Sequence, residues 1–458
     1  MDPEKVYRTL VRIAEAGIRR ADPYGMIING CSIEDNLLTV TDPGGACGEE
    51  RERSWDLGQF DEIFVLGAGK ATAKMALAVE QLLGEPITDG LIAVKPGHSE
   101  NLVRIRQIEA SHPVPDERSV EAAESVLKVA QQGTGKSLFI NLISGGGSSL
   151  LCLPAEGLTL QDKQTVTKLL LGAGATIQEM NCIRKHLSRI KGGRLAEALT
   201  PAVSINLILS DVVGDSLDAI ASGLLVPDRT TFTDALQILK KYNLEDSIPR
   251  AACEILIKGS RGEIEETPKP ENPAFEQSTP ILIGTNSASL AAACEEADNM
   301  GYAAFNMGSF ITGEAREAAK FFLALGKGIR SGAVPLPIPA CLIGGGETTV
   351  TLRGDGLGGR NQEFALSFTA ELGTDSDPDM CSRLFLLAAA TDGNDGPTDA
   401  AGAFGSLEGY RRGEKLGLSV QDYLRKNDSY HYFTKTGLLY APGPTNTNLC
   451  DLYILIVE

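Results

Sequence analysis

The sequence is poor in histidine, in paired cysteine and in long apolar runs, and each shortage excludes a class of site or protein. Four histidines in 458 residues argue against a His-rich metal centre. The nine cysteines include no C-x-x-C pair, so we expect reduced thiols in a cytoplasmic protein rather than a disulfide framework or a zinc site. No stretch of about 18 uncharged apolar residues occurs, so we expect neither a signal peptide nor a membrane span.

Basic residues are in deficit as well. The chain has 42 Lys and Arg against 60 Asp and Glu, a formal charge of −18. This excess of negative charge disfavours nucleic acid or an anionic membrane as the main partner, and a small anionic ligand would need a local basic pocket. With 43% hydrophobic and 22% charged residues, the composition is otherwise that of a folded globular protein, and the length predicts two or three domains.

What the sequence does contain is a set of apolar runs that end in glycine and polar residues. The clearest is Leu138–Ser149, LFINLISGGGSS, which predicts a buried parallel strand that enters a tight loop. Glycine amides can approach an anion closely, and serines add hydroxyl donors. A Gly-rich turn without a ligand fits this stretch alone equally well. The candidate phosphate-binding residues are Ser144, Gly145, Gly146, Gly147, Ser148 and Ser149.

A second run, Ile63–Leu66, predicts a strand that enters the turn GAGK at 67–70 and then a helix over 71–83. The turn is half of a dinucleotide-binding fingerprint, because Thr72 stands where the third glycine of G-x-G-x-x-G belongs. Lys70 lies at the predicted start of the helix, where a cation opposes the helix dipole unless it meets an anion. We therefore predict that Lys70 faces a ligand.

Two other stretches are set aside. Ala130–Ser137, AQQGTGKS, matches a relaxed Walker A pattern, but it connects a predicted helix to a strand, whereas a P-loop follows a strand and precedes a helix. Lys136 is therefore expected to be an exposed turn residue. His112 begins the proline-stiffened turn HPVPD, and we interpret it as structural.

A basic block follows the glycine-rich loop in the chain. The stretch NCIRKHLSRIK at 181–191 places four Arg and Lys within eight residues. Such a run is usually a solvated helix face, and its alternative is an anion-binding role. Arg184 and Lys191 are the better candidates for that role.

Carboxylates end the next predicted strand, Ser204–Leu209, in the motif SDVVGD. Asp211 and Asp215 would then lie where open α/β sheets bind ligands. One or two carboxylates together with substrate phosphates suit Mg²⁺. Asp215 is also a good N-cap for a helix over 216–222, and both roles can hold together.

The Pro-rich and polar stretch 262–280, GEIEETPKPENPAFEQSTP, is interpreted as a domain linker. It divides the chain into an N-terminal domain, 1–262, and a C-terminal domain, 280–458. Each half alternates predicted strands and helices, which predicts an α/β fold for both.

The second half repeats the pattern of strands that end in polar loops. The strand 339–343 enters a GGGETT loop that carries Glu347, and a glycine-rich segment delivers Arg360 beside Asn361. A guanidinium there can grip phosphate or carboxylate with two hydrogen bonds. The last long strand, 384–390, ends in TDGNDGPTDAAG, whose three aspartates form either a capping network or a metal and base cluster that includes Asp392.

Taken together, these motifs resemble the glycerate 2-kinase family (class II glycerate kinase, MOFRL), whose members have often been labelled hydroxypyruvate reductase. The blocks occur in the family's order and cover nearly the whole chain. They are GAGKA from Gly67, LISGGGSSLL from Leu142, NCIRKHLSRIKGGRLA from Asn181, SDVVGD from Ser210, GGGETTV from Gly344, GGRNQE from Gly358 and TDGNDGPTDAAGA from Thr391.

The resemblance implies ATP- and Mg²⁺-dependent phosphorylation of D-glycerate to 2-phosphoglycerate. It also implies a Rossmann-like N-terminal domain and a MOFRL-type C-terminal domain with the site in the cleft between them. Glycerate and ATP are the expected partners, and a homodimer is the expected assembly. Two alternatives stay open. One is an NAD(P)H-dependent hydroxypyruvate reductase, although the turn at 67–70 lacks the third glycine of the dinucleotide-binding fingerprint. The other is a non-catalytic nucleotide sensor.

Phosphoryl transfer needs cradling amides, cations, a divalent metal and a carboxylate near the accepting hydroxyl, and the sequence offers candidates for each. The expected catalytic residues are Lys70, Asp211, Arg360 and Asp392. The metal ligands would be Asp215 and Glu347. Besides the residues of the glycine-rich loop, Lys191 and Asn361 are expected to bind the nucleotide.

Overall fold

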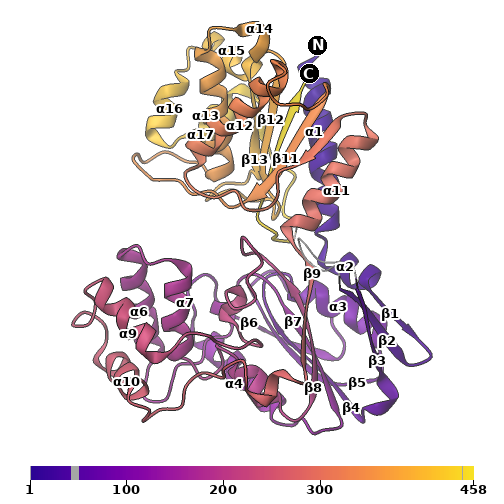
Figure 1. Cartoon of the computed structure of the whole chain (residues 1–458), viewed down its shortest axis with the longest axis vertical. Coiled ribbons are helices and arrows are strands. Elements are labelled where there is room, and N and C mark those ends of the chain that lie inside the picture. The colour runs from indigo at the N-terminus through magenta and orange to yellow at the C-terminus, as the bar shows by residue number, and fades with distance from the viewer. Residues whose placement is uncertain (1, 43–50, 446) are drawn as a thin grey trace. The chain divides into compact units, whose positions relative to one another are not determined.

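The computed structural model describes residues 2–42, 51–445 and 447–458, so Cys47 and Asn446 lie outside the described residues. The chain forms two compact units (Figure 1). We call Pro23–Ile283 the Rossmann-like unit, and Met1–Asp22 together with Gly284–Glu458 the C-terminal unit. Among the described residues, no helix has the length and apolarity needed to cross a membrane.

The Rossmann-like unit is built on a six-stranded sheet in the order β6-β5-β4-β7-β8-β9. The pairings from β6 through β8 are all parallel. Counted along the chain the order is 3-2-1-4-5-6, that of doubly wound dinucleotide-binding sheets. Apolar runs buried on both faces explain the central strands. The strands are β4 (Glu62–Ala68), β5 (Ile87–Val94), β6 (Ile105–Glu109), β7 (Ser137–Ile143), β8 (Val203–Leu209) and β9 (Ser278–Gly284).

Helices connect these strands, and four of them form a separate cluster beside the sheet (Figure 1). We call this cluster the helical lobe; it has its own apolar core around Leu170, Ile183, Leu239 and Leu256. Threonine capping boxes begin three of its helices. The lobe comprises α6 (Leu160–Gly172), α7 (Ile177–His186), α9 (Phe232–Lys241) and α10 (Arg250–Ser260), and the other helices are α3 (Thr72–Leu83), α4 (Glu117–Ala130), α5 (Gly147–Leu150) and α8 (Arg194–Leu199).

A small antiparallel sheet precedes the main one. It follows α2 (Pro23–Gly30) and contains β1 (Cys31–Glu34), β2 (Leu37–Asp42) and β3 (Arg51–Asp56). Strand β3 is polar and mostly exposed, so its sequence carries little strand signal. Leu38 and Val40 are buried and anchor this sheet to the unit.

The C-terminal unit contains a mixed six-stranded sheet in the order β10-β11-β15-β12-β13-β14. Its strand β15 is antiparallel to both neighbours, so β11 and β12 run in the same direction. The strands are β10 (Ala303–Asn306), β11 (Ala340–Gly346), β12 (Leu384–Ala390), β13 (Gly402–Ser406), β14 (Leu439–Tyr440) and β15 (Asp451–Val457). A parallel sheet in one unit and a second sheet in the other confirm the expected two-domain α/β fold.

Helices cover both faces of this sheet (Figure 1). Gly17 of α1 packs against Leu452, whereas Gly326 of α12 packs against Leu455, and side chains of opposite parity on one strand point to opposite faces. Helix α13 also packs on β12 and β13. The helices are α1 (Pro3–Arg20), α11 (Asn286–Asn299), α12 (Ala315–Arg330), α13 (Arg360–Thr374), α14 (Pro378–Cys381), α15 (Leu407–Lys415), α16 (Val420–Lys426) and α17 (Ser429–Thr436).

Two boundaries differ from the sequence-based division at 1–262 and 280–458. Helix α1 belongs to the C-terminal unit, because its stripe Val6, Leu10 and Ile13 is buried in that unit's core. The stretch 262–280 is no free linker, since it packs within the Rossmann-like unit. Glu266, for example, accepts hydrogen bonds from the amide of Phe232 and the ammonium of Lys269.

Candidate functional site

The polar loops of the Rossmann-like unit meet at one edge of its sheet. Strands β4 and β7 are neighbours, yet the chain leaves them in opposite directions, toward β5 on one side and β8 on the other. This is the topological switch point, outside which open α/β sheets bind ligands. The turn that carries Lys70 follows β4, and the Gly145–Gly147 loop follows β7.

The turn after β4 is locked to the glycine loop. The amide of Lys70 donates to the carbonyl of Gly145 at 2.9 Å, and the helix itself begins at Thr72 with Ala71 as its N-cap. Lys70 therefore lies just before the helix rather than in its first turn. Its side chain runs beside Gly146, with Cγ 3.5 Å from the position that a Cβ there would occupy.

The glycine loop leaves backbone donors free. Within the described part of the chain, the amides of Gly145 and Gly146 donate no hydrogen bond to a protein acceptor. Gly146 has φ 87°, a conformation that glycine adopts without strain. Two such amides beside a lysine form a concave positive site suited to a phosphate.

The three serines of this loop are engaged inside the protein. Ser144 is buried, and its hydroxyl accepts from the amide of Ala71 at 3.1 Å. The hydroxyl of Ser148 pairs with that of Ser222 at 2.8 Å, and that of Ser149 donates to the carbonyl of Gly146 at 3.0 Å. In this structure these hydroxyls shape the loop, and the glycine amides are the groups left open.

Two histidines that the sequence interpretation did not use also lie here. The imidazole of His112 approaches Gly146 so closely that a Cβ there would be 2.9 Å from its Cδ2. Burial lowers the pKa of His112 to about 4, and the positive charges of Lys70 and Lys95 act in the same direction. Nδ1 of His98 lies 3.0 Å from the carbonyl of Lys70, so that nitrogen carries the proton. Both histidines follow parallel strands, and that position was the signal available in the sequence.

The carboxylates after β8 adjoin the same loop. A Cβ on Gly145 would lie 2.3 Å from Oδ2 of Asp211, so this carboxylate lies directly against the glycine loop. Asp215 is half-buried with φ 53°. Burial raises the pKa of Asp215, and a hydrogen bond from the Ser210 hydroxyl opposes the rise.

The basic block is mostly structural. Lys191 is only 1% exposed, and its ammonium donates to the carbonyls of Ser148 and Leu151 at 2.6 and 2.9 Å. Burial lowers the pKa of Lys191 to about 7. Lys191 thus stabilises the glycine loop through its carbonyls. It does not present a charge to a nucleotide, although the sequence suggested that role.

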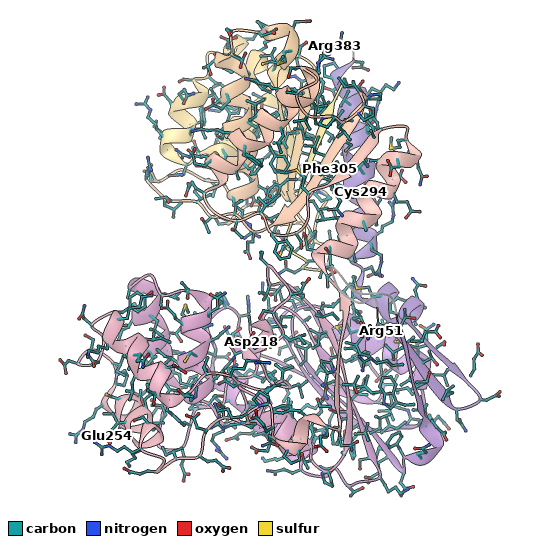
Figure 2. All side chains as sticks on the ribbon, viewed as in Figure 1. Arg51, Asp218, Glu254, Cys294, Phe305 and Arg383 are labelled. Atoms are coloured by element: carbon teal, nitrogen blue, oxygen red, sulfur yellow. The ribbon has the colours of Figure 1, made fainter. Side chains whose placement is uncertain are left out.

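Lys185, in the same block, is buried as well and lies 3.3 Å from both Asp218 and Asp228. Asp218 lies between α7 and the sheet (Figure 2). The Walker-like turn behaves as predicted, because α4 ends at Ala130, β7 begins at Ser137 and Lys136 is exposed between them.

In the C-terminal unit, the register brings the other predicted loops to one edge. Gly346 at the end of β11 and Ala390 at the end of β12 both pair with Asp451, the first residue of β15. Glu347 and Asp392 therefore follow strand ends that lie on either side of Asp451. The β15 end carries a buried carboxylate that the sequence interpretation did not single out.

Arg360 joins two of these groups at the start of α13. Its Nε and Nη2 donate to the two oxygens of Asp451 at 2.6 and 3.0 Å, and its Nη1 donates to Glu347 at 2.7 Å. Burial alone would lower the pKa of Arg360, but Asp451 and Glu347 raise it. Since guanidinium carries five N–H donors, two remain beyond these three bonds, and the side chain is 31% exposed.

Each of the three aspartates of the loop after β12 accepts a hydrogen bond from the protein. Asp392 accepts from the amide of Asn394 at 3.0 Å, and Asp399 accepts from the hydroxyl of Tyr430 at 2.7 Å. Asp395 accepts from the amides of Asn361 and Gln362 at the start of α13, at 3.1 and 2.8 Å. Of these three aspartates only Asp395 caps a helix. Asp392 closes a turn within its own loop, and its role as a base stays a prediction.

Asn361 is a buried bridge between carboxylates. Its Nδ2 donates to Asp395 at 3.3 Å and to Asp451 at 3.0 Å. Burial raises the pKa of Asp395 to about 7, the two amides oppose the rise, and the charge of Asp451 adds to it. Asn361 is fully buried, so its contacts here are with these side chains.

Comparison with known proteins places the chain in a family. Residues 9–257 match a domain of unknown function, DUF4147, and residues 340–451 match the MOFRL family. The glycerate 2-kinase of Pyrococcus horikoshii is 39% identical over 448 residues, which cover 98% of this chain and 96% of that protein. An Agrobacterium vitis protein with a provisional hydroxypyruvate reductase name is also 39% identical, over 453 residues that cover 98% and 94%.

A solved structure agrees with these relatives. The crystal structure of glycerate kinase from Thermotoga maritima has a TM-score of 0.84 at 35% identity, and the alignment covers 100% of both chains. Both units therefore have counterparts in a glycerate kinase. The chain belongs to the glycerate 2-kinase family, with its DUF4147 part in front of its MOFRL part.

Proposed function

We propose that this protein is a glycerate 2-kinase, which transfers the γ-phosphoryl group of ATP to the 2-hydroxyl of D-glycerate and yields 2-phosphoglycerate and ADP. Relatives named glycerate kinase, at 36 to 40% identity over most of the chain, support the assignment. The observation that carries it is the pair of unpartnered amides at Gly145 and Gly146 beside Lys70, at the switch point of the sheet.

These residues are suited to bind the phosphates of a nucleotide. Backbone amides and a lysine neutralise phosphate oxygens without reorganising, which is the main requirement of phosphoryl transfer. Neutral His112 adds a polar ring beside Gly146 without adding another charge. We propose that Gly145, Gly146 and Lys70 hold the phosphates of ATP.

Asp211 and Asp215 fit a magnesium ion in part. No three His, Cys, Asp or Glu side chains of the described residues gather closely enough to hold a metal alone. Mg²⁺ commonly takes one or two carboxylates with phosphates and water, and the loop after β8 offers these two. Magnesium bound with ATP would neutralise phosphate charge. Glu347, the other ligand expected from the sequence, is the ion-pair partner of Arg360.

Arg360 is proposed to bind the carboxylate of glycerate through its remaining N–H groups, with Asp451 fixing the orientation of the guanidinium. A bidentate partner that is fully buried restricts the rotation of the side chain. The proton of the 2-hydroxyl needs an acceptor. Asp392 is the candidate when Asp211 holds magnesium, and Asp211 is the candidate when it does not.

The reductase alternative finds less support. NAD-binding sheets place an acidic residue near the end of the second strand, whereas here β5 ends in Val94 and is followed by Lys95. Thr72, in place of the third glycine, is fully buried. The open amides also follow β7 rather than β4.

Purified protein with D-glycerate, ATP and Mg²⁺ tests the proposal. ADP release that requires both glycerate and Mg²⁺, with 2-phosphoglycerate identified by ³¹P NMR, is the expected result. Oxidation of NAD(P)H by hydroxypyruvate without ADP release would replace the kinase by the reductase. ATP binding without turnover would replace it by a sensor.

A further inference from the structure

A cavity of about 550 Å³ lies in the Rossmann-like unit, outside the loops described above. Its walls come from the segment before α6, the connection between α7 and α8, and α10 with the residues that follow it. The volume is within the range of small-molecule sites. Glu254 on α10 lies at the outer side of the helical lobe (Figure 2).

The charged lining of this cavity has one more cation than carboxylates. Arg189, Arg194 and Lys258 line it, against Glu156 and Glu263. Within the described part of the chain, no carboxylate lies within ion-pair distance of any of the three cations. Nη1 of Arg194 is buried without a hydrogen-bond partner, although leaving a buried donor unsatisfied costs about 1–3 kcal/mol.

The other side chains of the lining that can donate a hydrogen bond, His186 and Ser188, are already satisfied. Nε2 of His186 lies 3.1 Å from Glu266, and its Nδ1 lies 2.8 Å from the carbonyl of Cys182. The hydroxyl of Ser188 donates to the carbonyl of Leu153 at 3.1 Å. The groups with unused donors are therefore the cations, and they select for an anion.

The segment 189–194 both lines the cavity and contacts the glycine loop. Between Arg189 and Arg194, both in the lining, lies Lys191, whose ammonium holds the carbonyls of Ser148 and Leu151. The amides of Gly192 and Gly193 donate to the carbonyls of Ser222 and Gly223. A ligand that orders Arg189 and Arg194 would therefore order the segment that positions the loop.

We propose that this cavity binds a small polyanion that carries two or more carboxylate or phosphate groups, and that its occupancy raises the affinity of the glycine loop for ATP. Binding of the anion stands on the cavity itself; the effect on ATP rests on the proposed function. The coupling is reciprocal, so ATP must raise the affinity for the anion by the same factor.

Isothermal titration calorimetry of the full-length protein, with citrate and with inorganic pyrophosphate as separate probes at constant ionic strength, tests the binding. We expect one of the probes to bind with a dissociation constant below about 1 mM, equivalent to about 4 kcal/mol. Which probe binds decides between carboxylate and phosphate chemistry. If neither probe binds at a concentration about 20-fold above that dissociation constant, the proposal is overturned.

Variants locate the site. Lys258→Met and Arg189→Met remove lining cations and should each weaken binding at least tenfold. Arg194→Met removes the cation with the buried donor and should weaken binding as much. Lys168→Met, on the exposed face of α6, is the matched control and should bind as the wild type does. Equal binding by wild type and both Lys258→Met and Arg189→Met would place the anion elsewhere and refute the cavity.

Coupling is read from binding of a non-hydrolysable ATP analogue without Mg²⁺, with and without the anion. A lower dissociation constant in wild type, lost in Lys258→Met, is expected. An unchanged constant would refute the coupling and leave the kinase proposal intact, because turnover is measured separately. Loss of turnover with intact anion binding would refute the kinase and not the cavity.

Discussion

Lys70 is the residue on which the phosphate assignment is tested most directly. Its amide is bonded to Gly145 and its carbonyl to His98, so its backbone position does not depend on the ammonium. Within the described residues no ion pair holds that ammonium. The side chain can therefore be replaced with little effect on folding.

We expect Lys70→Met to lower kcat/KM for ATP at least tenfold, about 1.4 kcal/mol of transition-state stabilisation, with thermal stability near that of the wild type. Steady-state kinetics and a melting curve measure the two effects. Lys136→Met, in the Walker-like turn, is the control and should be silent. Unchanged kinetics of Lys70→Met would remove Lys70 from the site.

Asp395 makes the C-terminal unit sensitive to pH. Its pKa in the folded protein is raised from an ordinary 3.8 to about 7. Because the folded pKa is raised, the protonated form of Asp395 stabilises the folded state. This contribution to the free energy of unfolding is complete below the unfolded pKa and is lost as the pH rises through the folded pKa. The window is therefore about pH 4 to 7, with an upper limit of about 4 kcal/mol.

Asp395→Asn removes this titration, so we expect its stability to fall less between pH 5 and 7.5 than that of the wild type. Urea unfolding followed at both pH values measures the difference. The absolute stability of the variant is not the test, because an amide replaces one acceptor by a donor. Parallel pH dependence of the two proteins would show that Asp395 stays ionised in the fold.

At the scale of elements, the loop between β7 and α5 depends on backbone conformation. Gly146 has φ 87°, and a Cβ there would lie 2.9 Å from His112. Gly84, at the end of α3, has φ 64° but open space around it. An alanine at Gly146, which lies in the left-handed region, costs about 1–2 kcal/mol of backbone strain. At Gly84, where ψ is −124°, the backbone is outside that region and an alanine there is strained as well.

Gly146→Ala and Gly84→Ala should therefore both lose stability, while only Gly146→Ala weakens ATP binding, by at least tenfold. Calorimetric titration of ATP and thermal melting separate the two effects. If Gly84→Ala weakened ATP binding as much, the loss would reflect general strain in the unit. If Gly146→Ala bound normally, the phosphates would not approach this loop.

At the scale of the whole molecule, the first helix of the chain stabilises its last part. Leu10 and Ile13 of α1 are fully buried in the core of the C-terminal unit. Truncating a buried leucine to alanine costs roughly 2–5 kcal/mol. A fragment that ends at residue 262 would lack both β9 and the unit against which α1 packs.

Leu10→Ala in the full chain should therefore raise amide hydrogen exchange in 284–458 and leave 23–283 nearly unchanged. Arg8→Ala, at an exposed position of the same helix, should change neither. Faster exchange confined to 23–283 would contradict the assignment of α1 to the C-terminal unit.

The sequence alone predicted the elements that depend on local chemistry. Apolar runs such as Leu138–Ile143 form central strands because both faces are buried. In the loop that follows, Gly146 has a positive φ that other residues adopt only with strain. The order of strand and helix was sufficient to separate the true loop at Gly145 from the Walker-like turn at Lys136. The motif set was also sufficient to indicate the family.

Only the tertiary structure decided which side chains meet. His112 reaches Gly146 because β6 and β7 end at the same edge of the sheet, and Asp451 reaches Arg360 because β15 lies between β11 and β12. Lys191 is buried beneath the loop, and α1 packs against α11, β12 and β15, which come from the other half of the chain. Strand order and register fix these partners, and no local pattern encodes them, because a residue's own neighbours in sequence do not determine which strand lies beside it.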